Sequence, residues 1–255
     1  MALYVQEAGP TDAPTIVFLH GAGVAGWMWQ PQVDDLAQDY HCLVPDLPGH
    51  GQSHDAQPFT LADCAAQIAD LIRKRAHDGH AHLVGLSMGA SITLQLLVEQ
   101  PELAGRIILS GPSAGPMPAI YNALTRFATP LARNDWMLRQ SARSLKLPDT
   151  LFDAFKQSQL RMSQELLVSI GQEIDQFRVP SLPHAVPVLT VVGQKEMKLN
   201  YQAARAVLTN IPDAVGRIAP HVGHIWNLEN PSLFNRMIRA WLTSAPLPEE
   251  LLPLS

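Results

Sequence analysis

The pentapeptide at positions 85–89, Gly-Leu-Ser-Met-Gly, places a serine between two glycines. This spacing is typical of a nucleophilic serine on a sharp turn from a strand into a helix, because only small residues fit beside such a turn. The context agrees, since the apolar pair Leu83-Val84 precedes the motif and a helical pattern begins at Ala90. We therefore predict that Ser87 is a nucleophile that attacks a carbonyl carbon. A Gly/Ser-rich loop without chemistry is the alternative interpretation.

A serine hydroxyl needs a base that takes its proton, and the base needs an acid that holds it in the correct tautomer. We favour His224 as the base, because Gly223 before it permits a tight loop beyond the last apolar run, and we keep His221 as the alternative. Glu196 is favoured as the acid, because it is the carboxylate that directly follows the apolar run 188–192. A solvated loop carboxylate is the alternative interpretation of Glu196.

Acyl transfer also develops negative charge on the carbonyl oxygen, which backbone N–H groups must stabilise. The sequence His-Gly-Ala-Gly at positions 20–23 follows the first apolar run, and its glycines let the backbone approach a substrate closely. We expect the N–H groups of Ala22 and Met88 to form the oxyanion hole, since Met88 follows the predicted nucleophile. The His20 side chain is interpreted as structural.

Short apolar runs alternate with helical patterns along the chain, and this alternation predicts the scaffold. The runs are typical of strands that are covered on both faces of a parallel sheet. They lie at 15–20, 41–45, 81–85, 107–110, 188–192 and, more weakly, 215–218, and the helical patterns lie at 61–75, 90–99, 202–208 and 232–241. The predicted fold class is therefore α/β, with a mostly parallel sheet flanked by helices and functional residues at the carboxyl ends of the strands.

The alternation stops between residues 112 and 182, where amphipathic helical patterns are separated by prolines. We interpret residues 112–182 as a helical cap inserted into a core domain that comprises residues 1–111 and 183–255. The proline-rich tail, residues 246–255, is expected to be a loosely packed end.

Together these motifs resemble the α/β-hydrolase superfamily, in particular its small esterases with a helical cap. The resemblance rests on positions 20–23, on the loop Pro-Asp-Leu-Pro-Gly-His-Gly-Gln-Ser at 45–53, on positions 85–89, and on Gly223-His224 followed by Glu229 and Pro231. It implies an eight-stranded, mostly parallel sheet, a serine–histidine–acid triad, a structural role for loop 45–53 and a cap that lines the substrate pocket. Members of this family most often carry Asp as the acid, so Glu196 is a departure from the pattern.

The expected substrate is a small, largely apolar carboxylic ester or thioester that forms an acyl-enzyme on Ser87. Trp27 and Trp226 lie near the predicted oxyanion loop and base, and the cap contains Phe127 and Trp136, so we expect these aromatic residues to line the pocket. Packing inside the cap is the alternative for the cap residues. The same triad would serve a C–C bond hydrolase, a lyase or an acyltransferase, and a hydrolase-like ligand receptor with little turnover is a further alternative.

The formal charge of −5 disfavours nucleic acid and anionic membranes as partners. No apolar stretch approaches the roughly 18 residues that span a bilayer, and the N-terminus has no signal-peptide pattern, so a cytoplasmic location is expected. The cap is locally basic, however, with Arg126, Arg133, Arg139, Arg143 and Lys146 against Asp135. These residues could receive an acidic partner, such as an acyl carrier or a coenzyme, but a solvated helix face is the favoured interpretation.

Neither a cofactor nor a metal site is predicted. Cys42 and Cys64 fall in a predicted strand and a predicted helix, and we expect both to be buried thiols. His77, His80 and His82 lack the spacing of zinc ligands and are interpreted as surface histidines.

Overall fold

The structure is a computed structural model that describes residues 3–56, 59–116, 134–182 and 186–254. At its centre lies an eight-stranded sheet with the strand order β1-β3-β2-β4-β5-β6-β7-β8. Strands β2 to β7 run parallel to one another, whereas the edge strands β1 and β8 pair antiparallel with their neighbours. The predicted α/β-hydrolase fold class is confirmed. The strands are β1 Val5–Ala8, β2 Thr15–Leu19, β3 His41–Pro45, β4 Ala81–Leu86, β5 Ala104–Ser110, β6 Val188–Gly193, β7 Val215–Ala219 and β8 Leu252–Pro253.

The apolar runs in the sequence correspond to the parallel strands β2 to β7, whereas the edge strands carry no such run. β8 corrects the prediction of a loosely packed tail, because Leu252 pairs with Ile218 of β7. Leu251 and Leu254, on either side of this short strand, are buried. The tail therefore closes the edge of the sheet.

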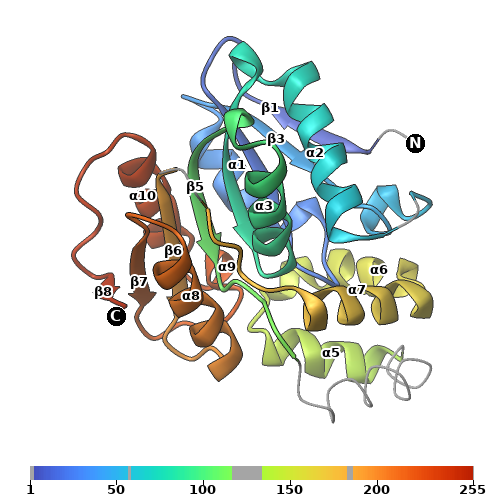
Figure 1. The fold of residues 1–255 in the computed structure, drawn as a ribbon. Helices are drawn as coiled ribbons and strands as arrows, with labels where there is room; N and C mark the ends of the chain where they lie inside the picture. The colour runs from blue at the N-terminus through green and yellow to red at the C-terminus, as the bar shows by residue number, and fades with distance from the viewer. Residues whose placement is uncertain (1–2, 57–58, 117–133, 183–185, 255) are drawn as a thin grey trace.

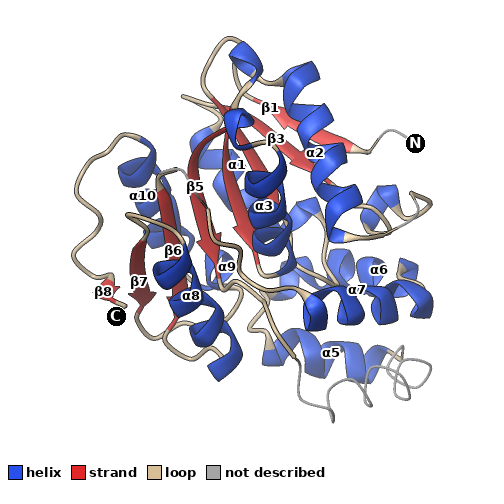
Figure 2. Cartoon of the chain, viewed as in Figure 1, coloured by secondary structure: helices blue, strands red, loops and turns tan. Residues whose placement is uncertain are grey.

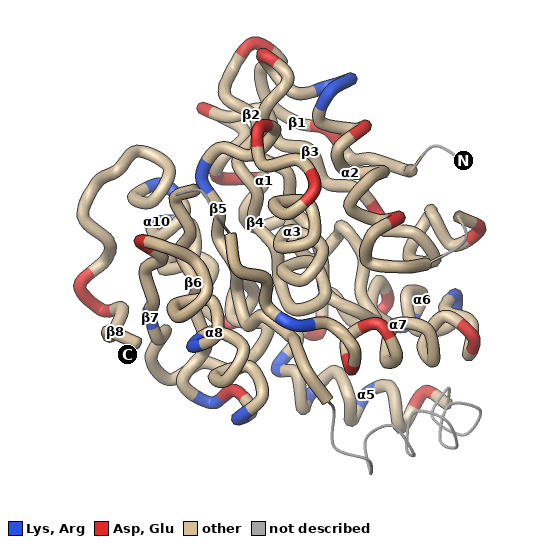
Figure 3. Tube along the Cα trace, viewed as in Figure 1, with Lys and Arg blue, Asp and Glu red and all other residues tan. Residues whose placement is uncertain are grey.

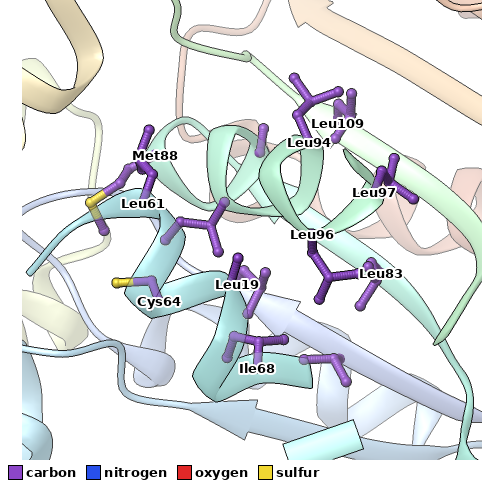
Figure 4. Packing of buried hydrophobic residues seen from close by; sticks show 14 of the residues in the cluster. Leu19, Leu61, Cys64, Ile68, Leu83, Met88, Leu94, Leu96, Leu97 and Leu109 are labelled. Carbon is purple, nitrogen blue, oxygen red and sulfur yellow. The ribbon is translucent and has the colours of Figure 1, made fainter. Parts of the chain in front are cut away.

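Alternate residues of the strands face two separate hydrophobic layers. In β2, Val17 and Leu19 belong to one layer, and Ile16 and Phe18 belong to the other. Helices α2, α3 and α8 cover the first face, where Figure 4 shows side chains of α2 and α3 packed over the strands, and helices α1 and α10 cover the second. Burial on both faces explains why the strands are continuous apolar runs in the sequence. The bounds of these helices are α1 Gln30–Leu36, α2 Leu61–Arg75, α3 Met88–Glu99, α8 Lys198–Asn210 and α10 Pro231–Leu242.

Helix α2 has the predicted bounds because both of its ends carry sequence signals. The Thr60 hydroxyl accepts a hydrogen bond from the Asp63 N–H at 2.9 Å, and basic residues occupy the last turn, where the helix dipole is negative. Helices α3, α8 and α10 extend beyond the predicted ranges by a few residues, and α1 was not predicted. Its short length leaves too few turns for a clear helical period.

Among the described residues between β5 and β6 are three helices: α5 Asp135–Ser144, α6 Phe152–Arg161 and α7 Gln164–Gln176. We refer to them as the cap helices. Figures 1 and 2 show them together at the end of the sheet toward which the parallel strands point. Figure 3 shows positive and negative residues interspersed along them. The cap helices therefore face the edge where the predicted site residues gather.

The other helical segments in the described ranges are short. Helix α9, Trp226–Glu229, follows β7, and 3-10 turns occupy Gly26–Trp29, Gly51–Ser53, His77–Gly79, Pro101–Leu103 and Asp149–Leu151. None of the helices in the described part of the chain is both long and apolar enough to cross a membrane. Cys42 and Cys64 are free and buried, as predicted, and burial raises the pKa of the Cys42 thiol to about 12.

Candidate active site

Ser87 occupies the turn between β4 and α3 with φ 56° and ψ −115°, a backbone conformation that side-chain-bearing residues rarely adopt. The two glycines of the motif make this turn possible. A Cβ atom on Gly85 would lie 2.5 Å from the Gly89 carbonyl oxygen, and one on Gly89 would lie 2.2 Å from the Leu19 carbonyl oxygen. Each is far closer than van der Waals contact allows, so the motif is required by the packing of backbone on backbone.

The hydroxyl of Ser87 lies 3.1 Å from the hydroxyl of Ser113. Ser113 follows β5, and its carbonyl oxygen accepts a hydrogen bond of 2.6 Å from the Ser91 hydroxyl on α3. The sequence reasoning missed Ser113, because the segment after β5 was assigned to the cap as a whole. The rule that functional residues follow the carboxyl ends of strands could have found it.

His224 and Glu196 form a direct pair, with His224 Nδ1 2.9 Å from Glu196 Oε2. The Glu196 side chain is 0% exposed, whereas that of His224 is 31% exposed. The other carboxylate oxygen of Glu196 accepts a hydrogen bond of 2.9 Å from the Gly193 N–H. A carboxylate acceptor at Nδ1 requires the proton on that nitrogen, so Nε2 of a neutral His224 is free to accept a proton.

The alternative base, His221, lies elsewhere. It is exposed, its backbone N–H donates to the Gln194 side chain, and it does not border the cavity that contains Ser87. His224 does border that cavity, together with Ser87 and Glu196. The structure thus brings together the three residues that the sequence favoured.

Gly111, the residue after β5, packs against the histidine–glutamate pair and was not singled out by the sequence. A Cβ atom there would lie 2.7 Å from Glu196 Oε2 and 2.9 Å from His224 Nδ1, and its φ is +51°. The buried Asn200 on α8 fixes this segment, because its side-chain amide donates to the carbonyl oxygens of Gly111 and Pro112 at 3.1 and 3.3 Å. The Glu196 carboxylate therefore sits in a space that only glycine leaves open.

The predicted oxyanion donors lie on either side of the Ser87 turn. Met88 is the first residue of α3, so its N–H has no acceptor within the helix. Ala22 borders the cavity, and no hydrogen bond among the described residues uses its N–H. Both N–H groups are therefore available to a ligand.

His20 is buried and braces the loop that carries Ala22. Its Nδ1 donates to the Gly21 carbonyl oxygen at 2.8 Å, and its Nε2 accepts from the Leu47 N–H at 3.0 Å. Burial lowers the pKa of His20 to about 4, which keeps the ring neutral. Loop 45–53 adds a second brace, since the Asp46 carboxylate accepts from the Gly26 N–H at 2.7 Å.

A cavity of about 790 Å³ lies over Ser87, between the core and the cap helices. Its walls are largely apolar and include Val24, Leu86, Phe155 and Leu167, with polar groups close to Ser87 and along the His224 loop. This size and polarity suit a small organic molecule with one reactive polar group.

The structure corrects the predicted pocket lining. The Trp27 indole donates to Ser158 of α6 and borders a separate groove, Trp226 is fully buried with its indole donating to Ser110, and Trp136 is exposed on α5. These rings therefore anchor loops or face outward rather than line the cavity. Phe127 lies outside the described residues.

The basic residues of the cap are engaged in part within the protein. The Arg139 guanidinium lies over the Phe152 ring at 4.1 Å, and Lys146 pairs with Glu229. Arg143 is exposed, and Arg126 and Arg133 lie outside the described residues. Of the three basic cap residues that the structure describes, Arg139 and Lys146 thus have partners within the protein.

No group of three or more histidine, cysteine or acidic residues in the described ranges is arranged to hold a metal ion. His77 and His80 are exposed, whereas His82 corrects the surface prediction. Its Nδ1 accepts a hydrogen bond from the Arg106 N–H, and burial lowers its pKa.

Comparison with known proteins gives a consistent picture. A family model described as "Alpha/beta hydrolase family" matches residues 16–237. An "AB hydrolase superfamily protein" from Gibberella zeae is 28% identical over 249 residues, which cover 94% of this chain and 84% of that protein. A protein from Yersinia enterocolitica named "Putative carbamate hydrolase RutD" is 26% identical over 262 residues, covering 94% of this chain and 92% of its own length.

Solved structures agree on the fold. The esterase EaEST from Exiguobacterium antarcticum superposes with a TM-score of 0.79 and 19% identity, over 94% of this chain and 95% of that one. At this identity the likeness concerns the fold alone. It extends over nearly the whole chain.

Proposed function

The chain belongs to the alpha/beta hydrolase family, and within this family we propose that it is a serine hydrolase that cleaves a small, largely apolar carboxylic ester or thioester through an acyl-enzyme on Ser87. The observation that carries the proposal is the 2.9 Å contact between His224 and the fully buried Glu196 carboxylate, beside the cavity that holds Ser87. A buried carboxylate that fixes one imidazole nitrogen is what a general base for a serine requires.

The first half of the reaction uses His224 as a base. The Ser87 hydroxyl turns from Ser113 toward His224 Nε2, gives up its proton there, and its oxygen attacks the carbonyl carbon. Glu196 stabilises the imidazolium that forms and keeps the ring in orientation. The N–H groups of Ala22 and Met88 stabilise the oxyanion, because backbone donors that are already fixed in place need no reorganisation as the charge develops.

Collapse of the tetrahedral intermediate expels the leaving alkoxide or thiolate, which takes the proton from His224 Nε2. A water molecule then attacks the acyl-enzyme, with His224 again acting as the base, and Ser87 leaves with the returned proton. The cap helices and the apolar wall residues Val24, Phe155 and Leu167 hold the acyl or alcohol group. They also limit the access of bulk water to the reacting carbonyl.

A carbamate is the second candidate substrate, because the Yersinia enterocolitica relative is named for carbamate hydrolysis. Its carbonyl carbon is open to the same attack by Ser87. C–C bond hydrolysis, lyase chemistry, acyl transfer and ligand binding without turnover use the same scaffold and remain the competing functions. A panel of nitrophenyl esters of increasing acyl length, a thioester and a nitrophenyl carbamate separates ester, thioester and carbamate hydrolysis by kcat/KM.

The first test of the proposal is labelling with a fluorophosphonate probe, which reacts with an activated serine. We expect the wild-type protein to be labelled and Ser87→Ala to remain unlabelled, and we expect the wild type alone to hydrolyse short-chain nitrophenyl esters. A wild-type protein that neither reacts with the probe nor turns over any ester of the panel would refute the proposal.

The acid is tested by Glu196→Gln, which keeps the shape of the side chain and removes its charge. We expect kcat to fall by about 10³-fold or more, because the His224 tautomer and the imidazolium both lose their support. The matched control is Asp213→Asn, which neutralises an exposed carboxylate before β7, at the opposite end of the parallel strands from Glu196, and it should leave kcat unchanged. Near-normal activity of the Glu196 variant would mean that another group orients the base.

A further inference from the structure

Glu229 lies at the end of α9 and uses its two carboxylate oxygens for different purposes. Oε1 accepts a hydrogen bond of 2.8 Å from the Gly223 N–H, directly before His224. Oε2 lies 2.5 Å from the Nζ atom of Lys146, which follows helix α5 of the cap. The Glu229 side chain is only 9% exposed, so its carboxylate is nearly buried and has little contact with water. One carboxylate thus connects the cap to the loop that carries the proposed base.

Lys146 is held in a conformation that usually belongs to glycine. It lies directly after Leu145, the C-cap of α5, with φ 53°. Its N–H donates to the Arg143 carbonyl oxygen at 2.9 Å, and the Leu147 N–H donates to the Ala142 carbonyl oxygen at 2.9 Å. These two hydrogen bonds form the turn that commonly closes a helix with glycine. A lysine at this position costs roughly 1 kcal/mol of backbone strain. This backbone conformation sets where the Lys146 side chain begins, close to Glu229.

The His224 loop has little other support on this side. The Lys195 N–H donates to the Val222 carbonyl oxygen at 2.9 Å, and the Gly223 carbonyl oxygen lies so close to Gly193 that a Cβ atom there would be 2.1 Å away. Both contacts hold the loop against the end of β6. Glu229 is the group that holds the Gly223 N–H from the opposite side.

We propose that Glu229 is a positioning residue for His224, and that Lys146 makes this positioning depend on where the cap helices lie relative to the core. With Lys146 in place, the Glu229 carboxylate is fixed at both oxygens and the Gly223 N–H is held. Without Lys146, a nearly buried carboxylate has one oxygen uncompensated and reorients toward water. The Gly223 contact then loosens, and the ring of His224 moves relative to Ser87. Small displacements of a catalytic group reduce turnover strongly.

This inference rests on the proposed function, and the variant Lys146→Gly tests it. Because glycine fits the turn without strain, the melting temperature should stay the same or rise, whereas kcat for a short nitrophenyl ester should fall about fivefold with KM unchanged. A structural role alone would move stability and kcat in the same direction. Lys146→Arg keeps the charge and should restore kcat.

Two further variants show whether the effect passes through Glu229. Glu229→Gln keeps an acceptor for the Gly223 N–H but removes the charge, and it should match Lys146→Gly. The double variant that combines Lys146→Gly with Glu229→Gln should have a kcat no lower than that of Glu229→Gln alone, because both changes break the same Lys146–Glu229 contact. Lys156→Met breaks the ion pair with Asp135 inside the cap and should leave kcat unchanged.

Hydrogen exchange of the Gly223 amide, monitored by NMR, tests the inference without an activity assay. Exchange should be faster in Lys146→Gly than in the wild type and unchanged in Lys156→Met. Unaltered exchange, additive losses in the double variant, or equal losses in Lys156→Met would each overturn the inference. If the wild-type protein has no hydrolytic activity, the proposed function fails while the exchange result still decides the role of Lys146.

Discussion

The space beside the Glu196–His224 pair is set by a missing side chain at Gly111. The two carboxylate oxygens of Glu196 and the Nδ1 atom of His224 all lie within 2.9 Å of the point that a Cβ atom on Gly111 would occupy. Because the Glu196 side chain is fully buried, its carboxylate has no free space into which it could move. The shape of the acid's site therefore depends on a residue that performs no chemistry.

We expect Gly111→Ala to lower kcat by about 100-fold, because the new methyl group displaces the acid or the ring of the base. The same change should lower the free energy of unfolding by at least about 1 kcal/mol, since φ is +51°. Esterase assays and urea unfolding measure the two effects.

A matched control separates the contact from the backbone strain. Gly79→Ala has a similar positive φ of +71°, but no atom lies within 4 Å of the added Cβ. It should lose stability and keep its activity. Equal activity in both alanine variants would show that the site accommodates the methyl group.

Among the elements, helix α6 connects the cap directly to the predicted oxyanion loop. The Gln159 side-chain amide donates to the Gly23 carbonyl oxygen at 2.6 Å, and Ser158 accepts from the Trp27 indole at 2.9 Å. Adjacent residues of one helix thus hold Gly23, the residue directly after Ala22, and Trp27, four residues further along the same loop. Lys146 holds the His224 loop from the end of α5, so the cap helices contact two of the loops around Ser87.

We expect Gln159→Leu to lower kcat about tenfold, because a loosened loop presents the Ala22 N–H less well to the oxyanion. The comparison is Gln157→Leu, an exposed residue on the same helix, which should behave like the wild type. Steady-state kinetics with nitrophenyl acetate distinguish the two variants. Similar losses in both would point to a general disturbance of α6 rather than to the Gly23 contact.

At the scale of the whole molecule, two neutral histidines link stability to pH. His20 and His50 are both buried, and their rings meet edge to face at 5.0 Å between centroids. Burial lowers the pKa of His20 to about 4, and burial together with the neighbouring His20 lowers the pKa of His50 to about 3. Neither ring can gain a proton in the folded protein near neutral pH.

Their effect on stability has a definite sign. Below pH 6.5 the unfolded chain binds protons at these histidines and the folded chain does not, so the free energy of unfolding falls as the pH falls. For His20 the loss develops between pH 6.5 and about 4 and reaches about 3 kcal/mol. Above pH 6.5 these histidines are unprotonated in both the folded and the unfolded chain, so they cause no loss in the free energy of unfolding.

Urea unfolding between pH 7.5 and pH 4.5 measures this loss. We expect His50→Gln to reduce the slope of stability against pH, whereas His54→Gln, at an exposed histidine, should leave the slope as in the wild type. A wild-type stability that does not change across this range would contradict the assignment of neutral buried rings.

The sequence by itself determined the features that depend on local pattern. The glycines around Ser87, the apolar runs of β2 to β7 and the caps of α2 are local requirements of a turn, a doubly covered strand and a helix end, so they can be recognised without the fold. The order of motifs also pointed to His224 and Glu196, which the structure brings into contact.

Tertiary structure decided what depends on residues distant in the chain. Several features arise from contacts between distant segments, whose separation in the sequence follows no recognisable pattern. They are the pairing of β8 with β7, the burial of Trp226, the space at Gly111 and the contacts of Ser113, Gln159 and Lys146. An aromatic residue near the site in sequence can equally line a cavity or anchor a loop, because direction and burial are set by packing. For this reason the residues that we propose as catalytic could be named from the sequence, whereas the contacts that hold them in place emerged only from the folded chain.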